Sequence, residues 1–386
     1  MKRAVMTAAL VVLSSLSIFA QPPDWTTQTL SVGGTPRGVV VGDFDGDGHL
    51  DFANALYNSP HGLTIYRGVG TRFTWTLAAE IALPPGPFGI TAADLDHDGA
   101  QEIIVSSADS NTISIVSWTN GAFVVATQIV TNSDPREIVT ADFNRDGNTD
   151  IAVALYACGC LEVWLGRGDR TFDATSRRSS AGAGAHGVAV ADFNNDGIPD
   201  VVVTNALAAS ATVLFGDGTG SFPLKVKVAT GSGPRYVTTG DFNHDGWPDF
   251  VTANTTGNSL THAAGVRGAH GAPTVAFTPH TITTQVPLKS PRDIEAIDFN
   301  GDGDLDVVFT SFDNDAVWVF TGNGAGGLGA EEGGNRGSVG RTLPDGPRSV
   351  AVGDLDEDGR PDVVVGLQSN GQTAILYNNT AFKGRP

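Results

Sequence analysis

The chain has 386 residues, a formal net charge of −19 and only two cysteines. Such an acidic surface argues against nucleic-acid binding, which depends on Lys and Arg side chains that neutralise phosphates. Two cysteines exclude a small scaffold held together by disulfides, and beyond the N-terminus no apolar stretch is long enough to span a membrane.

The first twenty residues are typical of a secretory signal peptide, because Lys2 and Arg3 precede an apolar run that ends at Ala20. We therefore expect residues 1–20 to be removed and residues 21–386 to form a single domain. The mature chain is expected outside the cytoplasm, in the periplasm, at the cell surface or in the medium. Loss of the two basic residues would lower its net charge to −21.

A spare β-rich run, residues 24–32, precedes the first of seven copies of one acidic phrase. The copies start at Asp43, Asp94, Asp142, Asp192, Asp241, Asp298 and Asp354, at intervals of 48 to 57 residues. A period near 50 residues is typical of propeller blades. Each copy follows one apolar run and precedes two or three more, with Gly, Asn and Asp between the runs. Four short antiparallel strands per unit predict an all-β, seven-bladed β-propeller.

The two ends of the chain predict how the ring closes. The last unit stops after its third run, residues 374–380, so it lacks an outer strand. The spare run at 24–32 can supply that strand and cover an otherwise open sheet edge. The alternative is that both ends are frayed.

Each acidic phrase has carboxylate or amide oxygens at positions 1, 3, 5 and 9, and glycine at position 6. Oxygen ligands at alternating positions of a short loop suit Ca²⁺, and the backbone carbonyl of position 7 can add a ligand, as in an EF-hand loop. An ordinary hairpin turn needs only one or two of these acids. Seven calcium ions would bring the mature chain to a charge of about −7, an ordinary value for a soluble domain. The sequence therefore predicts up to seven structural calcium sites.

The predicted metal ligands are Asp43, Asp45, Asp47, His49, Asp51, Asp94, Asp96, Asp98, Ala100, Glu102, Asp142, Asn144, Asp146, Asn148, Asp150, Asp192, Asn194, Asp196, Ile198, Asp200, Asp241, Asn243, Asp245, Trp247, Asp249, Asp298, Asn300, Asp302, Asp304, Asp306, Asp354, Asp356, Asp358, Arg360 and Asp362. Units one, two and seven carry four carboxylates, whereas units three to six have Asn at position 3. Because affinity for calcium rises with ligand charge, we expect tighter binding in units one, two and seven.

Five of the seven turns before the first strand of a unit carry arginine: Arg37, Arg136, Arg235, Arg292 and Arg348. Symmetry places them around one mouth of the central channel, opposite the acidic loops. A ring of guanidinium groups could hold a carboxylate, a sulfate or an anionic sugar. Alternatively, each arginine pairs with a carbonyl or an Asp of the next blade.

Cys158 and Cys160 flank Gly159, whose flexibility permits a tight turn. The pair could close a local disulfide. A soft-metal site is the weaker alternative, since the chain offers no further cysteine as a ligand.

The phrase D-[FL]-[DN]-x-D-G-x-x-[DE], with a later segment such as VLFGDGTGSF at 213–222, resembles the FG-GAP/VCBS repeat family in its secreted bacterial form. The integrin α-chain propeller belongs to the same group. The resemblance implies a seven-bladed propeller with calcium in the acidic loops and ligands at the opposite face. The function we expect is a monomeric binding or adhesion module for a protein or glycan. No segment resembles an inserted ligand-binding domain, so integrin ligands do not carry over.

The competing hypothesis is a polysaccharide-processing enzyme, similar to a lyase, built on a propeller. His262, Arg267 and His270 lie in an extended stretch of the fifth unit that could form a lid. No nucleophile motif or Ser-His-Asp order accompanies them, so no catalytic residue is predicted and the binding module is preferred.

Overall fold

The computed structural model of the protein describes residues 25–59, 62–266, 276–282, 287–329 and 338–380. These residues form 28 strands and one short 3-10 helix, η2 (Phe312–Asn314). No helix among them is long and apolar enough to cross a membrane. The predicted signal peptide, residues 1–20, lies outside the described residues and stays a prediction.

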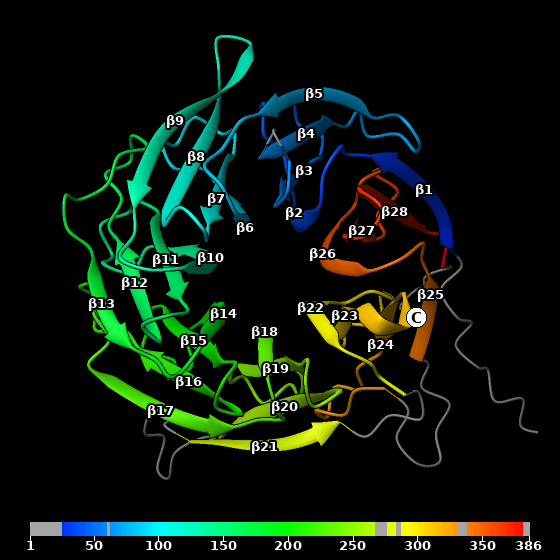
Figure 1. Ribbon diagram of the computed structural model, residues 1–386. Coiled ribbons are helices and arrows are strands. Elements are labelled where there is room, and N and C mark those ends of the chain that lie inside the picture. The colour runs from blue at the N-terminus through cyan, green and yellow to red at the C-terminus, as the bar shows by residue number, and fades with distance from the viewer. Residues whose placement is uncertain (1–24, 60–61, 267–275, 283–286, 330–337, 381–386) are drawn as a thin grey trace, which may run out of the picture.

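Seven four-stranded antiparallel sheets surround a central axis, which confirms the predicted all-β, seven-bladed propeller (Figure 1). We number the blades in chain order, from blade 1 (β2–β5) to blade 7 (β26–β28 with β1). The innermost strands are β2 (Pro36–Gly42), β6 (Pro87–Ala93), β10 (Pro135–Ala141), β14 (Ala185–Ala191), β18 (Pro234–Gly240), β22 (Pro291–Ile297) and β26 (Pro347–Gly353). The second strands are β3 (Asp51–Leu56), β7 (Glu102–Ser107), β11 (Asp150–Leu155), β15 (Asp200–Asn205), β19 (Asp249–Asn254), β23 (Asp306–Ser311) and β27 (Asp362–Leu367).

The third strands are β4 (Leu63–Arg67), β8 (Thr112–Thr119), β12 (Cys160–Trp164), β16 (Ser210–Phe215), β20 (Ser259–Val266), β24 (Ala316–Phe320) and β28 (Gln372–Asn378). The outer strands are β5 (Thr76–Ile81), β9 (Ala122–Val130), β13 (Arg177–Ser180), β17 (Leu224–Ala229), β21 (Ala276–Ile282), β25 (Ser338–Thr342) and β1 (Trp25–Ser31).

Burial follows the position of a strand in its blade. Every residue of all seven second strands is buried, as expected for continuous apolar runs covered on both faces. Outer strands such as β5 and β17 are largely exposed and more polar. The Phe or Leu at position 2 of each acidic phrase is also buried, so this residue anchors the loop in the core between blades.

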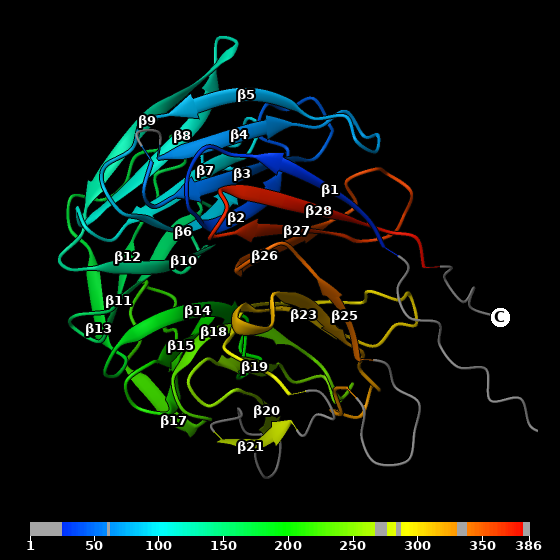
Figure 2. The same cartoon turned by 45° about the vertical axis from the view of Figure 1, so that its right-hand side comes forward.

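The ring closes as predicted, by pairing of the N-terminal strand with the last blade. β1 runs antiparallel to β28, from Trp25 opposite Asn378 to Ser31 opposite Gln372. Figure 2 shows the two strands side by side at the junction of the chain ends. Trp25 is buried and its ring lies 5.1 Å from that of Phe299 in blade 6. The outer strand therefore joins two blades as well as covering an edge.

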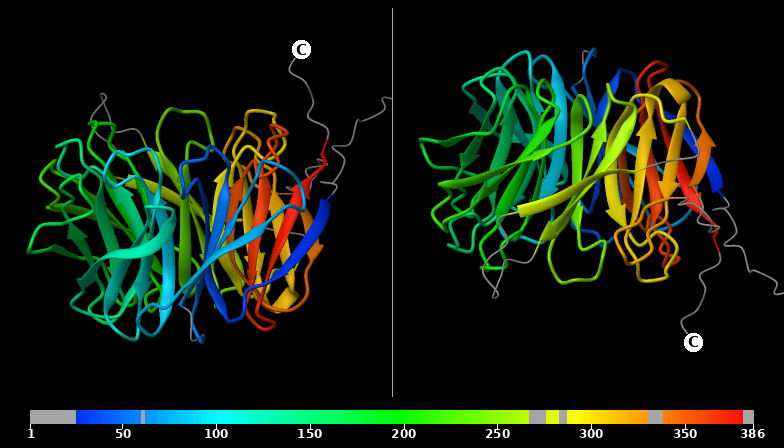
Figure 3. Two further views of the ribbon diagram at one scale, coloured as in Figure 1. Left: turned by 90° about the horizontal axis from the view of Figure 1, so that it is seen from above. Right: turned by 90° about the horizontal axis from the view of Figure 1, so that it is seen from below.

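All seven innermost strands start at the same end of the ring and finish at the other. The residues that follow them, the acidic loops, therefore gather at one end, while the turns that precede them gather at the opposite end. The views across the ring in Figure 3 show loops at both ends of the strands. This arrangement separates the two candidate sites by the length of a strand.

Candidate functional site

Each acidic loop is wound around the carboxylate at position 1. In blade 1, Asp43 Oδ1 accepts the N–H of Asp47 at 3.1 Å and Oδ2 accepts the N–H of Gly48 at 2.9 Å. Gly48 has a φ of +89°, and the position-6 glycine has a positive φ in every other loop as well. Only glycine adopts this backbone without a steric cost, which explains why it recurs at position 6.

The acid at position 9 ties the loop to the end of the third strand. Asp51 is buried, and its two oxygens accept the N–H groups of Phe44 at 3.1 Å and Gly68 at 2.9 Å. Burial raises the pKa of Asp51 to about 7. A cation in the loop would favour the ionised form of this carboxylate.

The carboxylate oxygens at positions 1, 3 and 9 converge in three loops. In blades 1, 2 and 7 one ligand atom from each lies within 4.8 Å of the others. The three triads are Asp43, Asp45 and Asp51; Asp94, Asp96 and Glu102; and Asp354, Asp356 and Asp362. In blade 2, Asp94 Oδ1 and Asp96 Oδ1 are buried without a hydrogen-bond partner. Orphaned carboxylate oxygens are costly unless a cation satisfies them, so this donor set fits a hard metal ion.

The remaining predicted ligands take different roles. In blades 3 to 6 the position-3 amide oxygen, as in Asn144, accepts the N–H of position 5 at 2.9 to 3.1 Å. The position-5 carboxylates lie outside the close triads, and Asp47 Oδ1 accepts the N–H of His49 at 3.0 Å. The proposed carbonyl ligands at position 7 stay predictions.

Three arginines that were not predicted as site residues reach into the three loops with four carboxylates. Arg67, at the end of β4, pairs with Asp45 and Asp47 of its own blade, the latter at 2.8 Å. Arg170 of blade 3 pairs with Asp96 at 2.7 Å and lies 3.7 Å from Glu102 in blade 2.

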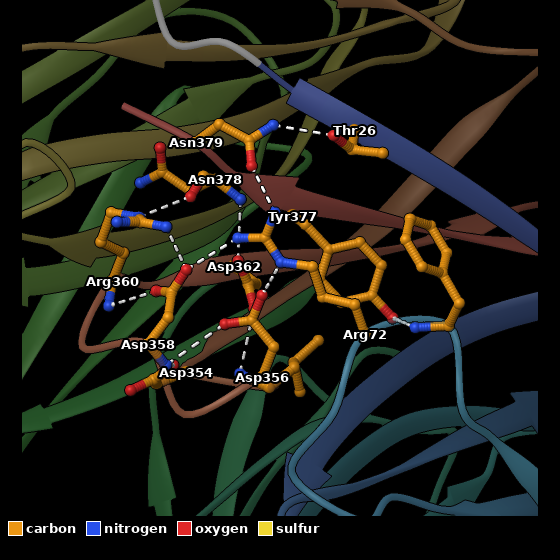
Figure 4. Close-up of polar contacts among 12 residues, drawn as sticks. Thr26, Arg72, Asp354, Asp356, Asp358, Arg360, Asp362, Tyr377, Asn378 and Asn379 are labelled. Atoms are coloured by element: carbon orange, nitrogen blue, oxygen red, sulfur yellow. Dashed lines mark hydrogen bonds and ion pairs between the residues drawn. The ribbon is translucent and has the colours of Figure 1, made fainter. Parts of the chain in front are cut away.

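The third of these arginines, Arg72 of blade 1, reaches across the ring closure to blade 7. Its guanidinium pairs with Asp356 and, at 2.7 Å, with Asp358, and it donates to Asn379. Figure 4 shows Arg72 pointing between these carboxylates while Arg360 pairs with Asp358 from the other side. The contact therefore ties the first blade to the last.

A sequence signal accompanies these contacts. Arg72 and Arg170 are the fifth residues of the segments GVGTR and GRGDR after the third strand, whereas blades 4 and 6 have GDGTG and GNGAG there. Gly220 and Gly326, the fifth residues of the latter two, donate to Phe143 O at 3.1 Å and Phe242 O at 3.0 Å. Those neighbouring loops have Asn at position 3.

Arginine at the fifth position of this segment thus occurs where the acidic loop of the preceding blade has Asp at position 3. Glycine at the fifth position occurs where that loop has Asn at position 3. Each guanidinium offsets the charge of one extra carboxylate. The expectation of tighter binding in units one, two and seven counted carboxylates alone, and it stays a prediction.

The five arginines of the opposite end are each the second residue of an innermost strand, where Phe88 and His186 occupy the other two places. The structure brings Arg37, Arg136 and Arg348 together around the buried ring of Phe88, at 5.5, 4.5 and 5.4 Å from its centroid. The arginines lie at one end of the channel, as symmetry predicts, and several of their guanidinium groups stack on aromatic side chains. Arg348 is only 3% exposed.

Two of the five arginines have a polar side-chain partner within their own blade or turn, not the carbonyl or Asp of the next blade that the alternative expected. Arg136 pairs with Asp134 at 2.6 Å and Arg348 donates to Gln368 at 2.9 Å. Arg292 stacks on Phe312 at 4.2 Å and Arg37 on Tyr57 at 4.1 Å. The Nε atoms of four of them are buried without a hydrogen-bond partner: Arg37, Arg136, Arg292 and Arg348.

Below this end the central channel encloses a cavity of about 380 Å³. Its charged and polar lining includes Arg37, Glu137, Tyr236, Asp293 and Glu295. Burial raises the pKa of Glu137 and of Glu295 to about 8 each. These acids stand in apolar runs without a motif, which explains why they were not predicted as site residues.

The residues of the enzyme hypothesis do not form an exposed lid where the structure describes them. His262 lies within β20, is 1% exposed and bonds through Nε2 to Asp249 Oδ2 at 3.0 Å. Arg267 and His270 fall outside the described residues. Cys158 and Cys160 form a disulfide, so neither is free to bind a soft metal.

Comparisons with known proteins agree with the propeller fold. The FG-GAP-like repeat family matches residues 98–153, 154–203 and 298–365. A search of curated proteins finds no match.

Among solved structures, a chain in the crystal structure of BBS1N in complex with ARL6DN aligns with a TM-score of 0.63 and 11% identity, over 93% of this chain and 98% of that one. Hydrazine synthase of Kuenenia stuttgartiensis aligns with a TM-score of 0.62 and 12% identity, over 91% and 97% of the two chains. An Agrocybe aegerita lectin specific for non-reducing terminal N-acetylglucosamine aligns with a TM-score of 0.54 and 14% identity, over 93% and 96%. At these identities the likeness concerns the fold alone.

Proposed function

This chain is an FG-GAP repeat β-propeller, and on that premise we propose that it is a secreted, calcium-binding module that holds a protein or carbohydrate ligand. The proposal of metal binding rests on the convergence of carboxylate oxygens at positions 1, 3 and 9 of the acidic loops in blades 1, 2 and 7. Orphaned oxygens on Asp94 and Asp96 add to it.

Calcium suits these loops better than magnesium. The donors are carboxylate and amide oxygens on an irregular loop, and calcium accepts six to eight oxygens in flexible geometry, whereas magnesium demands a tight octahedron. Bound calcium would supply positive charge that lets the position-1, position-3 and position-9 side chains stay ionised close together. The loop would then hold the first and second strands of each blade in a fixed relation.

Binding is favoured over catalysis by the placement of the candidate groups. His262, the histidine of the enzyme hypothesis, is enclosed in blade 5 and bonded to the position-9 Asp249. The arginine-bearing end, by contrast, gathers cationic groups whose Nε–H donors lack partners. A lectin shares this fold, which makes a glycan one of the two ligand classes to test.

The ligand is proposed to contact the arginine-bearing end through an acidic group. Arg235 and Arg292 are partly exposed there, whereas Arg348 is buried and braces the core. The double variant Arg235→Ala with Arg292→Ala should still fold, because both positions are partly exposed and truncation there should cost less stability than at the buried Arg348. Arg145→Ala, an exposed arginine in the acidic loop of blade 3, is the matched control.

The experiment is a glycan and peptide array probed with residues 21–386 in calcium. The proposal expects capture of acidic glycans or peptides by the native chain and by the Arg145 variant, with at least tenfold weaker capture by the double variant. Equal capture by all three proteins would place the ligand site elsewhere. Depolymerisation of a captured polysaccharide would instead support the enzyme hypothesis.

A further inference from the structure

The outer strands of blades 3 and 4 carry a concentration of positive charge. β13 has the sequence RRSS and β17 the sequence LKVKVA, whereas the other five outer strands together hold one Lys or Arg, Arg341 of β25. Residues 174–185 and 218–233, which include the two strands, contain no Asp or Glu, although the whole chain has a net charge of −19. We call the four cations of these strands the basic rim: Arg177, Arg178, Lys225 and Lys227.

Three of the four side chains project over the junction between blades 3 and 4. Arg177 of β13 is paired across the sheet with Val163. Lys225 of β17 is paired in the same way with Leu214. Directly paired residues of antiparallel strands share a face of the sheet, and both partners belong to one hydrophobic cluster between the two blades. Lys227 stands two residues after Lys225 and faces the same way, so cations from both blades line the outer edge of the junction.

The two strands are in contact at this edge. The ammonium group of Lys225 donates to Ser180 O of β13 at 3.1 Å, and the side chain of Arg177 lies beside Gly220 of blade 4. Figure 1 shows β13 and β17 one after the other along the outside of the ring. Because a strand rises about 3.3 Å per residue, Lys225 and Lys227 project from points about 7 Å apart. The cations therefore form a short row across two blades.

The basic rim has no carboxylate partner in the part of the chain that the structure describes. Three of its side chains are exposed and Arg177 is partly buried, and none of the four forms an ion pair there. The acids of the loops that lead into the two strands are engaged elsewhere. Asp173 pairs with Arg167, and Asp217 accepts from the Thr219 hydroxyl at 2.6 Å. By contrast, the arginines at the acidic loops each contact a carboxylate. The rim thus offers positive charge to an external anion.

A linear acidic polysaccharide fits this surface better than other polyanions. Its carboxylates form charge-assisted hydrogen bonds with Lys and Arg, and its hydroxyl groups find partners in Ser179 and Ser180 of β13. Neither strand carries an aromatic residue on which the bases of a nucleic acid would stack. An anionic membrane would extend beyond the rim and be repelled by the rest of an acidic molecule, whereas a single sugar chain can stay within the junction.

We propose that the basic rim binds a polyuronate, a linear polysaccharide with a carboxylate on each sugar, across the junction of blades 3 and 4. Arg177, Lys225 and Lys227 pair with successive carboxylates. This surface lies on the outermost strands, three strand spacings or about 14 Å from the innermost strands that carry the other arginines. The proposal therefore goes beyond the proposed function and does not depend on it.

The test is calorimetric titration of residues 21–386, in about 1 mM calcium, with a hexamer of galacturonate. A titration of the hexamer into the same buffer without protein corrects for calcium binding by the probe itself. The proposal expects binding that weakens about tenfold or more as the ionic strength rises from about 0.01 M to 0.15 M, because exposed charges are screened. The methyl ester of the hexamer has the same sugars without the charge and should not bind.

The double variant Lys225→Gln with Lys227→Gln should weaken binding of the hexamer about tenfold or more, because two charge-assisted contacts are lost. Lys289→Gln with Arg341→Gln is the matched control, since it removes the same charge from exposed positions of blade 6. It should bind like the native chain. Lys225→Arg with Lys227→Arg keeps the charge and should also bind. All variants should keep the native melting temperature, measured by circular dichroism, since changes at exposed sites cost little stability.

Several outcomes overturn the proposal. They are no binding of the hexamer by the native chain, equal binding of the methyl ester, and equal weakening by the control variant. A polyglutamate of equal length that binds more tightly than the hexamer would assign the rim to an acidic protein. Capture of anionic lipid vesicles without binding of the hexamer would assign it to a membrane.

The arginine variant of the proposed function separates the two sites. If Arg235→Ala with Arg292→Ala abolishes binding of the hexamer and the lysine variant does not, the rim proposal fails and the proposed function stands. If the lysine variant alone loses the hexamer, the rim binds it, whether or not calcium stabilises the chain and the array captures a ligand.

Discussion

The contact between Arg72 and the acidic loop of blade 7 gives a sharp test of how the ring is held closed. Arg72 is 31% exposed, whereas the side chain of its partner Asp356 is only 3% exposed. An exposed ion pair contributes about 0–1 kcal/mol, and loss of one partner of a buried pair costs about 3–5 kcal/mol. This pair lies between those limits, so Arg72→Gln should lower the free energy of unfolding in chelator by about 2 kcal/mol.

The assay is urea unfolding followed by tryptophan fluorescence, with Arg167→Gln as the matched control. Arg167 stands on the equivalent loop of blade 3, but its ion pair with Asp173, at 3.3 Å, has side chains 54% and 43% exposed. Its loss should cost less than about 0.5 kcal/mol. If the two substitutions lower the free energy of unfolding equally, the contact between Arg72 and Asp356 stabilises the ring no more than an exposed ion pair does.

A double-mutant cycle tests the pairing of arginine with an Asp at position 3. Asp356→Asn copies the residue found in the loops of blades 3 to 6, so it should remove the need for Arg72. The double variant should then recover about 1 kcal/mol or more relative to the sum of the two single changes. Strictly additive effects would refute the interpretation.

Three further predictions concern the channel and the cysteines. Because the pKa of Glu137 is about 8 in the folded chain and about 4.3 when unfolded, the folded state binds the extra proton and loses stability as pH rises from about 4 to 8. Glu137→Gln should therefore raise the melting temperature more at pH 9 than at pH 4, and an equal shift at both would contradict this. Phe88→Ala should lower the free energy of unfolding by about 3–5 kcal/mol, because it empties a buried site among guanidinium groups. A loss below about 1 kcal/mol in urea unfolding would show that Phe88 is loosely packed. Replacement of Cys158 and Cys160 by Ser should cost only about 1–2 kcal/mol, since the closed loop is very short, and a loss of folding in a dichroism spectrum would mean that the turn has a larger role.

The repeat pattern was enough to predict the fold because each element of a blade has a local signature. Buried second strands such as Asp362–Leu367 appear as continuous apolar runs, and the spare run before the first unit indicated the partner of β28. The acidic loops were equally visible, since position 6 requires a positive φ and position 1 binds backbone N–H groups within the loop. Interactions of short range dominate these features.

The features that escaped prediction depend on contacts between blades. Arg72 and Asp356 are 284 residues apart and meet only because the ring closes. His262 was assigned to an extended loop, but β20 continues its pairing with β19 and β21 and turns the imidazole inwards. Arg348 was expected at the mouth of the channel, and the sequence did not indicate that Phe88 would pack against its guanidinium there. Contacts between side chains of different blades leave no repeating pattern in the sequence, so they could not be predicted from it.

The most direct test of the account is the effect of calcium on the stability of residues 21–386. At about 1 mM calcium and a dissociation constant near 10⁻⁴ M, each loop would add about 1.4 kcal/mol. Up to seven loops would add on the order of 10 kcal/mol as an upper limit. Differential scanning calorimetry in calcium, in magnesium and in excess chelator measures this contribution. The account predicts a melting temperature many degrees higher in calcium than in the other two conditions, and identical melts in all three would contradict it.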